Sequence, residues 1–399
     1  MNPRVVLAAI LVAAFAGAVV FGPVSAQRAS ELQQMRQGFS ERSDATLAEP
    51  YRGIISGAPE RDLFPIRATG VSTEPVRLAA QAFLAALTPE QRARTTYPVD
   101  DVEWRKWANQ DIYIRQGVSF LDMTDAQREK AFDLIRAGLS AKGFTQTRNI
   151  MRLNYTLGEL NDNNFDRYGE WPYYLTVMGE PSATEPWGWQ FDGHHAVINY
   201  FVLRDQVVMT PLFAGSEPVI ARTGKYAGTV VLQEEQTRGL AMLNALDAAQ
   251  RKQAIVSVSK TGNNNISEAF KDNQVLDYAG IRATALNEVQ RRQLIDLVGL
   301  FVSNMREGHA RVRMDEVRRH LDRTYFAWIG SPGDKVFYYR IHSPVILIEF
   351  DHQVPVGLRH LSPMPTLPNP EHVHIVIRTP NGNDYGKDLL RQHYAQHPH

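Results

Sequence analysis

The chain has 399 residues, and its 43 basic and 43 acidic side chains balance. A balanced charge gives no electrostatic attraction for nucleic acid or for an anionic membrane, so we expect neither as a partner. The sequence contains no cysteine, which excludes disulfides, zinc–thiolate sites, iron–sulfur clusters and cysteine nucleophiles.

The first 26 residues are typical of a secretory signal peptide. A positively charged start at residues 1–4 precedes an uncharged apolar run from Val5 to Phe21, and Val24-Ser25-Ala26 has the form of a cleavage site. We therefore expect cleavage before Gln27 and a periplasmic or secreted protein, with no membrane association after cleavage. The alternative is an uncleaved anchor, because the 17-residue run is long for a signal core and short for a membrane span.

No linker-like composition divides the rest of the chain, so a single domain is expected over residues 76–399. Residues 27–75 are expected to form a partly irregular N-terminal extension. At the start of the domain, a helix is predicted over residues 74–87, and another is predicted over residues 314–322. The inward face of the first should be formed by Val76, Leu78, Ala79, Phe83 and Leu87.

Four helices are predicted to begin with the same capping box. Thr88, Thr124, Asp247 and Asn287 each precede a glutamine by three residues, so that each of the two side chains can bond the other residue's backbone N–H. The intervals between these starts are 36, 123 and 40 residues, which is no fixed period and argues against a solenoid.

Strands are expected in the middle and at the end of the chain. The predicted segments are residues 171–178, 194–203, 207–213, 324–329, 335–342, 345–350 and 372–378, and a further strand is expected at Trp187. Pro344 should limit how the strands on either side of it pair, and the five prolines of residues 353–371 predict a long surface loop. Because helices and strands do not alternate strictly, we predict an α+β fold. Amphipathic helices should pack on a largely antiparallel sheet, with a helical N-terminal part.

Motifs for several common chemistries are missing. The sequence has no nucleophile elbow, phosphate-binding loop, dinucleotide-binding glycine motif or H-E-x-x-H zinc motif. Residues 257–260 and 260–262 match two β-lactamase motifs, S-x-x-K and K-T-G. Both matches use Lys260, so they cannot form two separate walls of a pocket, and we interpret them as coincidence.

The H-x-H pair at His372 and His374 is the most informative polar feature. Alternate side chains of a strand share a face, so both imidazoles should lie on one face with Arg378, while Val373, Ile375 and Ile377 form the opposite, core face. The two backbones would be about 6.5–7 Å apart. That spacing lets both imidazoles reach one metal ion at about 2.0–2.1 Å.

Further site residues are expected on neighbouring strands. Glu349 and Asp351 share one face of their strand. His194 and His195 should point to opposite faces, so that only one of them joins the site, where carboxylate is the natural further ligand type. We assign His194, His372 and His374 as candidate metal ligands, and His195, Asp351 and Arg378 as candidate catalytic residues.

Other interpretations of these residues remain open. The same side chains could form a metal-free polar pocket, or the histidines could be purely structural. Arg378 could recognise a carboxylate or phosphate through its planar guanidinium group, or simply precede the turn at residues 379–384. Trp187 and Trp189 could form a sugar-stacking platform or pack in the core.

Several blocks of the sequence resemble the DUF3500 family. The resemblance covers roughly residues 79–393. It rests on Pro186-Trp187-Gly188-Trp189-Gln190-Phe191-Asp192-Gly193-His194-His195 through Asn199, Thr210-Pro211-Leu212-Phe213-Ala214-Gly215, Tyr338-Tyr339-Arg340-Ile341, Leu347-Ile348-Glu349-Phe350-Asp351, His372-Val373-His374, Arg378, Asn383-Asp384-Tyr385-Gly386 and Asp388-Leu389-Leu390. The family is one of unknown function, so the resemblance implies no reaction. It implies that the polar blocks form a recurring unit.

The leading hypothesis from the sequence is an exported enzyme, either a metal-dependent or a histidine-based hydrolase. Its cofactor is undetermined, with a divalent metal ion as the candidate. The alternative is a non-enzymatic extracytoplasmic module for a carbohydrate or another small molecule, with Trp187, Trp189, Tyr338 and Tyr339 exposed around a groove. A third possibility is an envelope-associated structural protein. Histidines of the two blocks lying more than about 10 Å apart could not share one ion.

Overall fold

The computed structural model describes residues 23–397. The apolar core of the predicted signal peptide lies outside the described residues, and the predicted cleavage pattern falls in the first turn of α1 (Pro23–Leu47). None of the helices in the described range is long and apolar enough to cross a bilayer.

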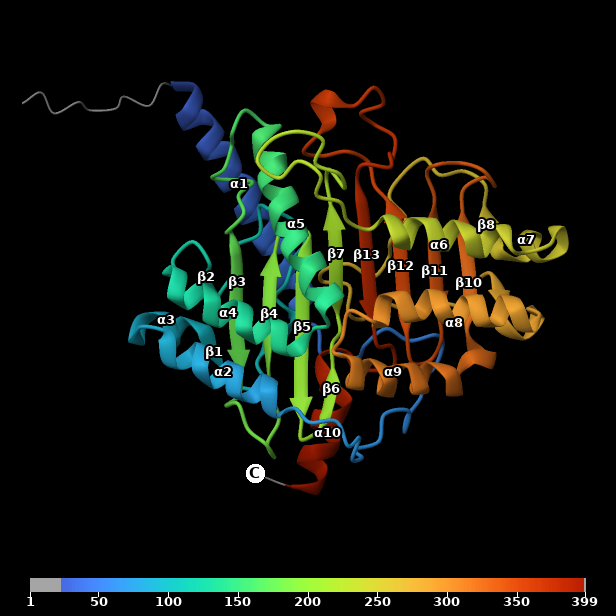
Figure 1. Ribbon diagram of the computed structural model, residues 1–399, viewed down its shortest axis with the longest axis horizontal. Coiled ribbons are helices and arrows are strands. Elements are labelled where there is room, and N and C mark those ends of the chain that lie inside the picture. Colours follow the sequence, from blue (N-terminus) through green and yellow to red (C-terminus); the bar gives the residue numbers. More distant parts are fainter. Residues whose placement is uncertain (1–22, 398–399) are drawn as a thin grey trace, which may run out of the picture.

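All strands of the described chain join one sheet, which is mostly antiparallel and confirms the predicted α+β class (Figure 1). Its main path runs β1-β3-β4-β5-β7-β13-β12-β11-β10-β8, with β2 beside β3, β6 beside β5 and β9 beside β10. Only β1–β3 and β8–β10 pair in parallel. The strands are β1 (Thr96–Tyr97), β2 (Val118–Ser119), β3 (Tyr173–Met178), β4 (Trp187–Gly193), β5 (Ala196–Leu203), β6 (Gln206–Val208), β7 (Leu212–Ser216), β8 (Ile255–Ser257), β9 (Ile281–Arg282), β10 (Tyr325–Ile329), β11 (Tyr338–His342), β12 (Leu347–His352) and β13 (Val373–Arg378).

Helices cover one face of this sheet. In Figure 1, α2, α4 and α5 lie in front of the half from β1 to β7, and α6, α8 and α9 lie in front of the other half. The helices are α2 (Glu74–Ala86), α3 (Pro89–Thr95), α4 (Asp125–Gly138), α5 (Ala141–Glu159), α6 (Gln233–Asn244), α7 (Ala248–Ala254), α8 (Glu288–Val302), α9 (Glu307–Arg319) and α10 (Lys387–Gln396). Val373, Ile375 and Ile377 of β13 enter the main hydrophobic core on this side, as the strand pattern predicts.

The opposite face of the sheet carries a smaller core and the polar residues of interest. Trp104 and Trp107 pack there with Tyr385 and with Leu389 of α10, against side chains such as Phe213 of β7. Residues that alternate with the main-core positions of β12 and β13 point to this side, which places His374, Asp351 and Arg378 on it.

The two halves of the chain repeat one arrangement. The order α2-α3-β1-α4-α5-β3-β4-β5-β7 recurs as α6-α7-β8-α8-α9-β10-β11-β12-β13, and the sheet order is symmetrical about the central β7–β13 pair. All four predicted capping boxes form. They meet as two matching pairs, since the Gln91 and Gln127 amides bond each other, as do those of Gln250 and Gln290. The four recurring motifs are therefore a pair repeated once.

Some predicted boundaries and faces were wrong. Leu78 is 51% exposed, and Ala80 and Leu84 take inward positions on α2 instead. The helix expected over residues 314–322 is α9, which begins seven residues earlier and ends at Arg319. The strand expected over residues 207–213 divides into β6 and β7 at Pro211, which has no N–H to donate to a ladder.

Pro344 does not limit pairing as expected. It lies in the turn between β11 and β12, and these strands pair along all five residues of β11, from Tyr338–Asp351 to His342–Leu347. Since the proline is outside the ladder, its missing N–H removes no hydrogen bond from it.

Candidate metal centre

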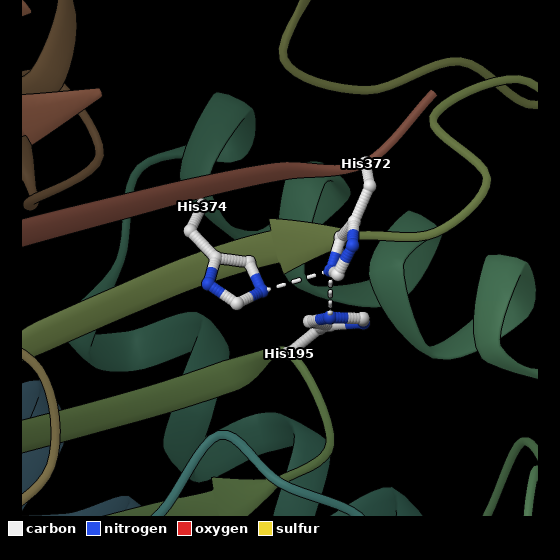
Figure 2. A group of neighbouring side chains, drawn as sticks. All are labelled: His195, His372 and His374. Carbon is white, nitrogen blue, oxygen red and sulfur yellow. Dashed lines mark hydrogen bonds between the residues drawn. The ribbon is translucent and has the colours of Figure 1, made fainter. Parts of the chain in front are cut away.

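Three histidines from the two halves of the chain meet beside the central strands. Figure 2 shows the rings of His195, His372 and His374 with nitrogen atoms turned toward one another. The Nε2 atom of His372 lies 3.0 Å from that of His374 and 3.3 Å from that of His195. One ligand atom from each histidine lies within 4.8 Å of the others, and all three side chains are buried. Among the described residues, this is the one group of at least three such side chains with metal-ligand spacing.

Strand geometry positions two of these imidazoles. His374 pairs with Asp351 of β12 on one side and with Gly215 of β7 on the other. His372 immediately precedes β13, and its carbonyl accepts the backbone N–H of Gln353, which continues the β12–β13 ladder. The two imidazoles therefore share a face, as the H-x-H spacing predicts.

His195 reaches the centre from a turn. The His194-His195 pair forms the two-residue connection between β4 and β5, with His195 in the left-handed region at φ 64°. The His195 carbonyl accepts the Gly215 N–H at 2.7 Å, which ties the turn to β7. The imidazole rings of His194 and His195 stack with their centroids 3.9 Å apart. The expectation that they point to opposite faces is therefore wrong, because neither lies in a regular strand.

The structure separates His194 from the other predicted ligands. Its Nδ1 atom lies 2.7 Å from the Asn154 side-chain oxygen, its ring packs beside Tyr168, and it is not in the three-histidine group. Burial lowers the pKa of His194 to about 3. The geometry thus places His195, expected as a catalytic residue, where His194 was expected as a ligand.

The outer nitrogens of two imidazoles face acceptor atoms. Nδ1 of His372 lies 2.9 Å from the Val354 carbonyl oxygen, and Nδ1 of His374 lies 2.7 Å from Oε1 of Glu268. Since a carbonyl or a carboxylate only accepts hydrogen bonds, each Nδ1 carries the proton and each Nε2 carries a lone pair. Two lone pairs 3.0 Å apart repel unless a cation or a proton lies between them. Ligand nitrogens on a tetrahedral zinc ion are separated by about 3.3 Å, given bonds of about 2.0–2.1 Å.

Burial keeps the imidazoles of His195 and His372 neutral. It lowers the pKa of His372 to about 4. It also lowers the pKa of His195 well below its usual value, and the neighbouring histidines add to that effect. Neutral imidazole is the form that binds metal ions.

Each histidine is held by a different loop. The backbone N–H of His195 donates to the Asn109 carbonyl at 3.2 Å, Glu268 belongs to the loop after β8, and Val354 begins the long loop after β12. The loop after β12 is fixed by the buried carboxylate of Glu217, which accepts the backbone N–H groups of residues 356–358. Oε2 of Glu217 also lies 3.6 Å from Nδ1 of His372.

Asp351 holds a loop, and its carboxylate is not part of the three-histidine group. Its carboxylate accepts the backbone N–H groups of Asn264 and Asn265 at 2.6 and 3.0 Å, and it lies 3.0 Å from Nζ of Lys260. Burial raises the pKa of Asp351 to about 6, and Lys260 opposes this shift. Lys260, the residue shared by the two β-lactamase-like motifs, is therefore the ion-pair partner of Asp351.

Arg378 also has a structural position. It is fully buried and pairs with Asp272 at 2.8 Å and Asp384 at 3.3 Å. Its remaining donors reach the carbonyl oxygens of Ser267 and Glu268, each at 2.9 Å. These protein partners engage every guanidinium nitrogen, so the geometry makes Arg378 a clamp on the loop that carries Glu268, and not a group presented to a ligand.

The expected aromatic groove is not formed. Trp187, Trp189, Tyr338 and Tyr339 are each at most 2% exposed and pack in the protein interior. The Tyr338 hydroxyl donates to Glu349 at 2.6 Å and that of Tyr339 to the Glu235 carbonyl at 2.8 Å. The exposure on which the binding-module alternative depended is therefore contradicted.

Sequence reasoning missed Glu268, Glu217 and Gly215. Glu268 lies in an irregular loop, where no periodicity indicates which way a side chain points. Glu217 was hidden by its position one residue beyond β7. Gly215 lay within a block that resembles the family, and that resemblance was its only signal.

Fold and centre together define a two-half, single-sheet α+β protein with three histidines gathered where its halves meet. The profile of the family described as "Protein of unknown function (DUF3500)" matches residues 69–387, and the chain belongs to that family. No curated protein and no solved structure matches the chain.

Proposed function

We propose that the protein is a metal-dependent enzyme that acts outside the cytoplasm, with a divalent transition-metal ion held by Nε2 of His195, His372 and His374. The observation that carries the proposal is the convergence of three buried Nε2 atoms, two of them with Nδ1 directed at acceptors. This is the arrangement in which protein histidines bind metal and outer groups fix their tautomer.

The donor set favours a hydrolytic reaction. Three imidazoles leave a fourth position on a tetrahedral ion, where zinc enzymes hold water. A bound zinc ion lowers the pKa of that water to about 7, which generates a nucleophile at neutral pH. We therefore propose hydrolysis of a small substrate that can enter a nearly closed site, since the three imidazoles are only 3–6% exposed.

Metal analysis of the purified full chain tests the binding step. We expect about one equivalent of bound metal in the wild type after dialysis against zinc, and its loss in His195→Ala and in the His372→Ala/His374→Ala double variant. His360→Ala is the matched control, because His360 is exposed on the loop after β12. A folded wild type that takes up neither zinc nor cobalt contradicts the proposal and indicates a shared proton between the imidazoles.

Two further measurements separate the other parts of the proposal. Zinc-loaded wild type should hydrolyse an activated ester such as p-nitrophenyl acetate faster than the metal-free protein and faster than His195→Ala. Equal rates would remove the hydrolase assignment and leave metal binding intact. An intact mass beginning at Gln27, measured on protein exported by a bacterial host, would support the extracytoplasmic location, and an uncleaved chain would oppose it.

A further inference from the structure

Glu268 is a mostly buried carboxylate at the edge of the three-histidine group. Its side chain is 18% exposed, and its Oε1 atom lies 2.7 Å from Nδ1 of His374. The Asn265 side-chain amide donates to the same oxygen. Within 4 Å, His374 is the one basic side chain beside Glu268 in the described part of the chain.

The surrounding structure fixes this carboxylate in place. The carbonyl oxygens of Ser267 and Glu268 accept from buried Arg378. On the other side, buried Glu349 accepts the backbone N–H groups of Ile266 and Ser267 at 2.8–3.1 Å. Two buried charges of opposite sign thus hold the short segment that ends at Glu268, so the position of its side chain is determined by the fold.

A carboxylate here needs an electrostatic explanation. His372 shows that a neutral carbonyl, that of Val354, is enough to orient an imidazole in this site. A buried carboxylate is costly unless it is hydrogen-bonded and a positive charge compensates it, and Nδ1 of His374 supplies the hydrogen bond. A divalent cation on Nε2 of His374 would supply that charge from the far side of the ring.

We infer that Glu268 is a positioning residue for the metal centre. It holds His374 in the tautomer whose Nε2 lone pair faces the other two imidazoles, and its negative charge increases the affinity of the site for a divalent cation. Glu217 adds to this charge from beside His372, at 3.6 Å. The inference depends on the proposed metal site and assigns to that site its outer carboxylate.

The test compares zinc affinity, by competition with a chromophoric chelator, in the full-length wild type, Glu268→Gln and Glu268→Ala. Loss of such an outer partner typically weakens metal binding 10- to 100-fold. We expect a loss of about that size for Glu268→Ala and a smaller one for Glu268→Gln, whose amide oxygen can still accept from Nδ1. Glu234→Gln is the control, because Glu234 pairs with Arg238 on the exposed surface of α6.

Spectra distinguish positioning from general stability. The visible spectrum of the cobalt-loaded protein should change in Glu268→Gln and stay unchanged in Glu234→Gln. If Glu268→Ala does not fold, Glu268→Gln carries the test alone. A wild type that binds no metal defeats the proposed function. A wild type that binds zinc, with variants of equal affinity and an identical cobalt spectrum, defeats only the inference about Glu268.

Discussion

Replacing Gly215 with alanine should disturb the three-histidine centre directly. Gly215 lies opposite His374 in the β7–β13 ladder and donates its N–H to His195. A Cβ atom at Gly215 would lie 3.0 Å from Cδ2 of His195, 3.1 Å from Cδ2 of His374 and 2.8 Å from the Val373 carbonyl oxygen. Carbon atoms pack best at about 3.5–4.0 Å, so both imidazoles must move by several tenths of an ångström.

The size of the effect follows from the tolerance of metal coordination. Ligand distances in metal sites hold to within about 0.2 Å, so a shift of about 0.5 Å in two of three ligands cannot be absorbed. Overpacking of a well-filled interior costs about 1–3 kcal/mol. If the metal-bound state bears this cost, the zinc dissociation constant rises about 5- to 150-fold, since 1.4 kcal/mol corresponds to a factor of ten.

Chelator competition measures this rise, and Gly262→Ala is the matched control because nothing lies within 4 Å of the Cβ that it adds. Thermal unfolding of both variants shows whether the fold is retained. Equal zinc affinities for Gly215→Ala and Gly262→Ala would refute the argument that the glycine leaves room for the two rings.

Three further substitutions test the framework around the centre. Arg378→Lys cannot reproduce the planar guanidinium contacts to Asp272, Asp384 and two carbonyls. It should therefore lower the stability of the protein by about 3–5 kcal/mol in urea unfolding, and weaken zinc binding because Glu268 is less firmly held. The control, Arg391→Lys at an exposed position, should change neither quantity. His342 is 1% exposed, and burial lowers its pKa from 6.5 to about 3. The unfolded chain therefore binds a proton that the folded chain does not, and stability is lost as the pH falls from about 6.5 toward 3. His342→Leu should remove about 2 kcal/mol of the loss between pH 6.5 and pH 5, measured by urea unfolding, and an unchanged slope would contradict this. Gln290→Ala leaves the Ala245 carbonyl and the Gln250 amide without their partner, so it should lower the free energy of unfolding by about 1–3 kcal/mol. The Gln250→Ala/Gln290→Ala double variant should lose less stability than the sum of the two single variants. Strict additivity would show that the two amides are independent.

Sequence patterns over a few residues were enough to predict the capping boxes and the shared face of the H-x-H pair. A capping box needs only a cap and a glutamine three residues later, and all four formed. The shared face of His372 and His374 needs only the two-residue period of a strand. Both patterns depend on backbone geometry over a few residues, which tertiary contacts leave unchanged here.

Long-range contacts decided what the sequence could not. His195 and His372 are 177 positions apart, and they meet because β7 pairs with β13 and carries the turn of His195 beside it. The same parity rule gave a wrong result at His194 because it assumes a strand where the chain turns. Asp351 and Arg378 were placed on the correct face, but the loop of residues 263–268 covers them there.

The internal repeat was hidden by unequal connections. Asp247 and Asn287 follow Thr88 and Thr124 by 159 and 163 residues, whereas β11 and β12 begin 151 residues after the matching strands β4 and β5. Between β5 and β7 the chain is short, whereas between β12 and β13 it makes the long proline-rich loop. No single period therefore fits the whole chain, although the symmetrical sheet makes the relation of the halves plain.

The three-histidine centre depends on a difference between the two halves of the chain at the strands where they meet. In the central ladder, His374 of β13 lies directly opposite Gly215 of β7, on the same face of the sheet. A side chain at both positions would fill the space that the imidazoles of His374 and His195 occupy, as the 3.0 and 3.1 Å distances to an added Cβ indicate. The second half of the chain thus supplies His372 and His374, and the first half supplies His195 and, at Gly215, the space for the rings. A symmetrical pair of strands would provide neither arrangement, so the site is a property of the joined halves and is absent from either half alone.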